Sequence, residues 1–141
     1  EWRKPMRKLF AAAALALFAL PGAAMADEKV NAKGEAELAK MLDGRVAGKP
    51  VKCLPTHAMD NSTIVDGTAI VYRSGSKLYV NRPRSGADQL DDDDILLTKL
   101  YGAQLCNVDK VDLLDRSSRM WSGFVMLGDF VPYQRVKTGA R

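Results

Sequence analysis

Histidine, cysteine and aromatic residues are scarce in this sequence. Its 141 residues include one histidine and two cysteines, and aromatic side chains make up 7%. A single imidazole excludes mechanisms that need two, and it excludes zinc sites built mainly from histidine. His57, Cys53 and Cys106 supply three zinc ligands, so a closed structural site of four would need an added carboxylate. We therefore predict no metal site of this kind and no cofactor.

A large excess of charge of one sign is also missing from most of the chain. The net charge is +4, but four of the 21 basic residues and one of the 17 acidic residues precede residue 27. The remainder carries 17 basic and 16 acidic side chains, and this balance gives no support for a nucleic-acid partner. With 47% hydrophobic and 27% charged residues, the composition fits one small globular domain.

The longest apolar run lies near the N-terminus and is too short to cross a membrane. The twelve residues 9–20 are uncharged, but in a helix they extend about 18 Å, against a hydrocarbon core of about 30 Å. Residues 6–8 (MRK) precede this run, and residues 21–22 (PG) and 24–26 (AMA) follow it. These are the three regions of a secretory signal peptide, which we expect to be cleaved after Ala26.

The sequence is thus divided into three parts. Residues 1–5 precede Met6, and we interpret them as an upstream extension of the reading frame. Residues 6–26 form the predicted signal peptide, and residues 27–141 form a single small domain that ends in a frayed basic tail. We predict a periplasmic or secreted protein with no stable membrane span after cleavage.

Cys53 and Cys106 both follow the predicted cleavage point. Export places them in an oxidising compartment, where a disulfide is the default interpretation of such a pair. A redox pair is the alternative, but redox dithiols usually lie close together in sequence, as in C-x-x-C. We therefore expect one structural disulfide between these residues.

One segment has helical periodicity, and most of the rest has the periodicity of strands. Residues 31–43 are rich in Ala, Glu, Lys and Leu, and they predict a helix that ends at Gly44. The connections at residues 66–67 (DG) and 74–76 (SGS) predict two hairpins. The predicted strands are residues 62–65, 68–73, 77–82, 95–100, 110–115 and 123–133, the last with a bulge at Gly128.

Residues 95–100 fit either a helix or a strand, and we favour a strand because Gly102 ends the run so soon. One helix followed by six or seven short strands predicts an α+β fold that is mainly antiparallel. Short strands must protect their edges, so we expect a small curled sheet or a partly open barrel.

Two chemical interpretations stay open beside a simpler one. His57 with a nearby Ser or Asp could serve a small hydrolase, although no G-x-S-x-G elbow occurs and an ordinary surface or packing role is the simpler interpretation. The run Asp91-Asp92-Asp93-Asp94 could attract calcium, but it lacks the D-x-D-x-D-G pattern. We favour a solvated loop that protects a sheet edge.

A possible binding surface comprises Tyr79, Asn81, Arg82, Arg84 and Trp121. The arginines could contact an anion or a partner, or they could only solubilise the end of a strand. Trp121 precedes Ser122-Gly123 in a predicted loop, so we interpret it as an exposed contact within an otherwise buried C-terminal segment.

Four short segments give the chain a resemblance to known proteins: residues 53–55 (CLP), 64–68 (IVDGT), 78–81 (LYVN) and 104–106 (QLC). On these, it resembles a family of small secreted proteins of Gram-negative bacteria with a signal peptide and one cysteine pair. The resemblance covers residues 53–133 and implies an exported, disulfide-containing β domain without an assigned activity. From the predicted export, the expected disulfide and the lack of a catalytic constellation in the sequence, we predict a non-enzymatic binding or structural module that acts on a protein, another envelope component or a small ligand. The hydrolase and the calcium-responsive module are the alternatives.

Overall fold

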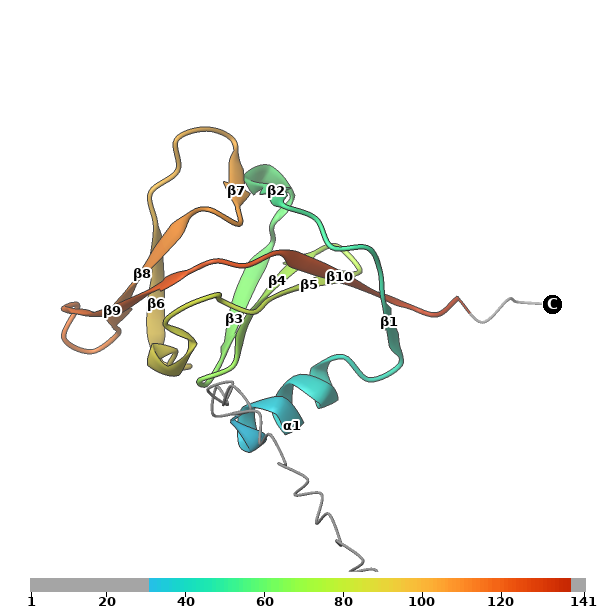
Figure 1. Ribbon diagram of the computed structural model, residues 1–141, viewed down its shortest axis with the longest axis horizontal. Coiled ribbons are helices and arrows are strands. Elements are labelled where there is room, and N and C mark those ends of the chain that lie inside the picture. Colours follow the sequence, from blue (N-terminus) through green and yellow to red (C-terminus); the bar gives the residue numbers. More distant parts are fainter. Residues whose placement is uncertain (1–30, 138–141) are drawn as a thin grey trace, which may run out of the picture.

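The structure is a computed structural model that describes residues 31–137, so the predicted signal peptide and the end of the basic tail lie outside it. The described chain has one α-helix, two short 3-10 helices and ten strands (Figure 1). The helices are α1 (Ala32–Met41), η1 (Thr56–Ala58) and η2 (Ala87–Gln89). The strands are β1 (Arg45–Ala47), β2 (Cys53–Pro55), β3 (Asn61–Val65), β4 (Ala69–Ser74), β5 (Lys77–Asn81), β6 (Asp94–Thr98), β7 (Gln104–Cys106), β8 (Lys110–Asp115), β9 (Trp121–Met126) and β10 (Phe130–Arg135). None of the described helices combines the length and the apolar character that a membrane crossing requires.

The strands form three sheets, and every strand pairing is antiparallel. The orders are β1-β10-β5-β4-β3, β6-β8-β9 and β2-β7, and none of the sheets closes on itself. The prediction of a mainly antiparallel fold with one α-helix is confirmed, and β6 confirms the strand within residues 95–100. The predicted count of six or seven strands is too low. Strands β1, β2 and β7 have three residues each, too few for a period-two pattern to be recognised.

The five-stranded sheet is the middle layer, with α1 on one face and the three-stranded sheet on the other. Side chains alternate along β4: Ile70 and Tyr72 enter the core shared with the three-stranded sheet, whereas Ala69 and Val71 face Leu38 of α1. Because both faces are covered, the first four residues of β4 are all buried.

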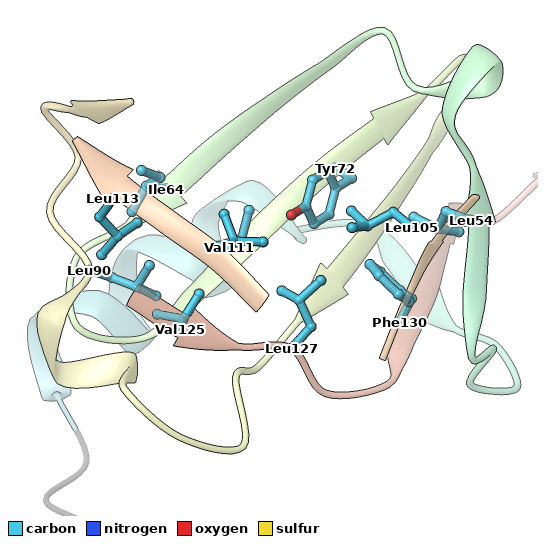
Figure 2. Packing of buried hydrophobic residues seen from close by; sticks show 11 residues of the cluster. Leu54, Ile64, Tyr72, Leu90, Leu105, Val111, Leu113, Val125, Leu127 and Phe130 are labelled. Atoms are coloured by element: carbon cyan, nitrogen blue, oxygen red, sulfur yellow. The ribbon is translucent and has the colours of Figure 1, made fainter. Parts of the chain in front are cut away.

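The larger core lies between the five-stranded and three-stranded sheets (Figure 2). Tyr72 and Phe130 meet edge to face within it, with their ring centroids 5.7 Å apart. Leu54 and Leu105 of the two-stranded sheet fill one end of this core, which extends along β8 and β9 to Leu90. The two-stranded sheet therefore contributes to the core even though its strands are very short.

Helix α1 is fixed to the turn between β3 and β4 by its N-cap residue, Asn31. The Asn31 side chain accepts a hydrogen bond from the N–H of Gly34 (3.1 Å) and donates one to the Asp66 carbonyl oxygen (2.9 Å). A Cβ atom on Gly34 would lie 1.9 Å from Thr68 Oγ1, so this glycine allows the helix to approach the turn closely. The helix ends near the predicted position, with Gly44 at a φ of 69° two residues beyond the C-cap Leu42.

Both predicted hairpins are present, with small differences in their turns. Val65 pairs with Ala69, so the first connection has three residues instead of two. An Asp-Gly pair between two strands favours a type I′ turn, in which two consecutive residues take a positive φ. Only Gly67 does so here, so the turn is of another type. Ser74 pairs with Lys77, and the second turn places Gly75 at a φ of 57°.

Residues 123–133 form two strands rather than one bulged strand. The chain leaves the three-stranded sheet after β9 and joins the five-stranded sheet at β10, crossing at residues 127–129. A Cβ atom on Gly128 would lie 2.4 Å from the Arg82 carbonyl oxygen, so a glycine is required at the crossing. The Asn81 amide donates to the Gly128 carbonyl oxygen (2.7 Å) and accepts from the Gly128 N–H (2.9 Å). The crossing thus depends on a contact that is distant in sequence.

Candidate binding surface

The outer face of the three-stranded sheet carries three exposed apolar side chains, Leu97, Trp121 and Phe124, which we call the aromatic strip. Trp121 is 61% exposed, Leu97 43% and Phe124 39%. Leu97 and Phe124 are both paired with Asp112 of the central strand β8, so they lie in one row of the sheet. The Trp121 and Phe124 rings stack at a centroid distance of 6.4 Å. Three apolar side chains are thus exposed on this face, with the Asp112 side chain between Leu97 and Phe124.

Two charged side chains of β8 hold the aromatic strip in place. Lys110 Nζ lies 5.5 Å from the centroid of the Phe124 ring and 2.8 Å from Asp112 Oδ1. The Trp121 indole N–H donates to the same Asp112 oxygen over 3.4 Å. The hydrogen bond from Lys110 holds the pKa of Asp112 below its ordinary value, and the bond from Trp121 adds to this. Asp112 thus stays charged and orients Lys110 and Trp121, the two side chains that lie against the Phe124 ring.

The predicted surface residues of β5 and its continuation lie in different environments. Tyr79 is partly buried and packs against the larger core. Asn81 is 0% exposed, and its amide is fully engaged with Gly128, so it offers no polar group to a surface ligand. Arg82 forms a bidentate ion pair with Glu35 of α1, and its hydrogen bond lowers the pKa of the Glu35 carboxyl.

Arg84 is exposed, and its backbone N–H donates to the Met126 carbonyl oxygen at the end of β9 (3.0 Å). Trp121 is exposed as predicted, but it begins a strand instead of lying in a loop. The alternation along β5 sends Tyr79 and Arg82 in different directions, so the five predicted residues do not form one patch. Phe124 and Leu97 were not among them, and the signal for Phe124 is its place between two inward-facing residues, Gly123 and Val125.

His57 lies exposed on η1. Within residues 31–137, no Ser, Asp or Glu side chain makes a hydrogen bond to its ring. The geometry therefore supplies no paired nucleophile or orienting carboxylate, and the hydrolase interpretation gains no support from it.

The four consecutive aspartates separate into different contacts. Carboxylate oxygens of Asp91 and Asp92 lie within 4.8 Å of each other and of Asp66, whereas Asp93 lies 3.4 Å from Arg116 Nε. Asp94 is buried and accepts a hydrogen bond from the Ser122 hydroxyl (2.9 Å). Asp66 also accepts the Asp92 N–H (2.6 Å). The prediction of a solvated loop at a sheet edge thus fits Asp91 to Asp93, which are exposed, but not Asp94, which begins β6 and is buried. The calcium-responsive role stays a prediction.

Comparisons of this chain with protein-family models, with curated proteins and with solved structures found no match. The resemblance to small secreted Gram-negative proteins therefore stays a prediction.

Proposed function

We propose that the protein is an exported, non-catalytic domain that binds a protein of the cell envelope through the aromatic strip. Residues 6–26 have the pattern of a secretory leader, and the two cysteines form a disulfide, which is typical of an oxidising compartment. Both features support export.

The stacked and exposed Trp121–Phe124 pair is the observation that carries the binding role. Large aromatic side chains concentrate the free energy of binding at protein interfaces, because each removes much apolar area from water on contact. Lys110 and Asp112 place charged groups directly beside the rings, with Asp112 between Phe124 and Leu97. A protein partner that combines apolar and polar groups at its contact surface would match this pattern.

The strip also lies on a rigid support. The central strand of its sheet, β8, is paired on both sides. The side chains of Val111 and Leu113, which point to the opposite face of this sheet, are 0% exposed. A preformed surface loses little conformational entropy on binding. The fixed position of the strip on a paired strand therefore supports its interpretation as a binding surface.

In-cell photo-crosslinking tests the proposal. A photoreactive amino acid at Trp121 should give one discrete protein adduct in the envelope fraction, and Phe124→Ala in the same chain should weaken that adduct strongly. The matched control is the same photoreactive residue at Tyr101, which is 98% exposed but lies outside the strip. Equal adducts from both positions, or none from Trp121, would contradict the proposed surface.

A further inference from the structure

Strand β3 is an edge strand of the five-stranded sheet, and β6 is an edge strand of the three-stranded sheet. An open groove lies between them. Its volume is about 500 Å³, and it is lined by residues 62–64 of β3 and residues 94–96 of β6, with Glu37, Asp92 and Arg116 at its rim. Within residues 31–137, neither strand has a second neighbour. The groove therefore separates two sheet edges, which are visible as β3 and β6 in Figure 1.

Sheet edges present backbone N–H and C=O groups that are not paired with another strand. On β3, residues 61–63 are exposed, which leaves the backbone accessible from solvent. Extended peptides bind such edges by adding a strand, so that main-chain hydrogen bonds provide the affinity and alternate side chains provide the specificity. The apolar side chains that line the groove are few: Ile64 is 6% exposed and belongs to the larger core, and Leu96 is partly buried against that core.

The rim of the groove is acidic. Glu37, Asp92 and Asp94 line it against the single cation of Arg116. Arg116 is itself close to Asp93, which partly neutralises it. Asp66 and Asp91 place two further carboxylates within 4.8 Å of Asp92. A cationic ligand would therefore be attracted to this end of the groove.

A second copy of the chain fits the groove poorly. Edge-to-edge pairing through β3 or β6 would bring together two sets of the same carboxylates, and such charges protect edges from self-association. An extended peptide with alternating side chains fits better: apolar residues would face the partly exposed Leu96, and basic residues would face the rim.

We propose that the groove between β3 and β6 binds an extended peptide segment that alternates apolar and basic side chains. The peptide adds a strand to one of the two edges, and its cations pair with Glu37 and Asp92. The groove shares no lining residue with the aromatic strip, although Leu97 of the strip follows Leu96 on β6, so the peptide experiment tests the inference independently of the proposed function.

Synthetic peptides test the inference with the unmodified, oxidised protein. The probe is a fluorescently labelled peptide of alternating Val and Lys, measured by anisotropy, and the controls are the Val and Glu version and a version with a central Pro. We expect the Lys peptide to bind at least about tenfold more tightly than either control. Binding should weaken as the salt concentration rises. Equal affinity for the Glu peptide, or no binding of the Lys peptide at about 1 mM, would overturn the inference.

Charge-reversal variants locate the site. Glu37→Lys combined with Asp92→Lys should weaken binding of the Lys peptide by about tenfold, whereas Asp43→Lys, at an exposed position outside the groove, should change it by less than about twofold. Amide hydrogen exchange on the wild-type protein adds a second measurement, in which bound peptide should protect residues 62–64 or 94–96. Binding that protects neither segment would show that strand addition at this groove is wrong.

Discussion

Cys53 and Cys106 lie directly opposite each other in the two-stranded sheet, and their disulfide joins β2 to β7. The next pair along the ladder, Leu54 and Leu105, is 3% and 2% exposed and belongs to the larger core. Two isolated strands of three residues are too short to be stable by themselves. The disulfide therefore holds two core leucines in place from outside the core.

Replacing both cysteines with alanine should lower the free energy of unfolding by about 3 to 4.7 kcal/mol, because the unfolded chain loses its cross-link. Urea denaturation of the variant and of the oxidised wild type measures this difference. Reduced wild type is the control and should match the variant. A loss below about 1 kcal/mol would mean that the disulfide contributes little to the fold.

Gly34 should not tolerate alanine, although alanine normally stabilises a helix by about 1 kcal/mol relative to glycine. The added Cβ would meet Thr68 Oγ1 at 1.9 Å and the Asp66 carbonyl oxygen at 2.6 Å. We expect Gly34→Ala to destabilise the protein by about 1–3 kcal/mol as α1 is pushed away from the turn. Ala36→Gly, at an exposed position of the same helix, is the control for propensity alone. A stabilised Gly34→Ala variant would contradict the close approach.

Asp115 gives the stability a defined dependence on pH. Its carboxylate accepts hydrogen bonds from the Ser117 hydroxyl (2.6 Å) and the Ser118 N–H (2.7 Å), which lower its pKa to about 2. Because the folded pKa lies below the unfolded one of about 3.9, the stabilisation is present above that value and is lost as the pH falls towards 2.

The difference in urea midpoint between wild type and Asp115→Asn should therefore be largest near about pH 6 and should shrink towards about pH 2. Asp43→Asn, at an exposed position, serves as the control and should differ from wild type by a small amount at every pH. A wild-type advantage over Asp115→Asn that stays constant across this range would disprove the role of the carboxylate charge.

Asn81 should affect stability rather than binding. Asn81→Ala would remove the partner of the partly buried N–H and C=O groups of Gly128, and we expect a loss of about 1–3 kcal/mol in all. Thermal and urea unfolding measure the loss, and Arg84→Ala, at an exposed position nearby in sequence, is the control. Unchanged stability of Asn81→Ala would mean that its amide is not needed to hold the crossing between the sheets.

Local patterns predicted the elements whose structure depends on neighbouring residues. The helix at residues 31–43 and the turns at Gly67 and Gly75 follow from capping and from turn chemistry, so the sequence was sufficient there. The division of residues 123–133 between two sheets was not predicted, because it depends on the contact of Gly128 with Asn81, 47 residues away.

Only part of the aromatic strip was predicted from the sequence. The exposure of Trp121 was predicted from a loop at Ser122-Gly123, but Trp121 begins β9, and its stacking partner Phe124 was not predicted. Which face a side chain of β9 occupies depends on the irregularity in the pairing at Leu113/Leu114, and such a shift moves residues between the core and the solvent face. The acidic groove was not predictable because it joins two edges far apart in sequence.

The intact mass of the non-reduced protein from the cell envelope is the most direct test, because the proposed binding to an envelope protein depends on export. We expect a chain that starts at Asp27 and lacks the two hydrogens that are lost when Cys53 and Cys106 form their disulfide. A full-length polypeptide recovered from the cytosol with both thiols reactive would contradict this expectation.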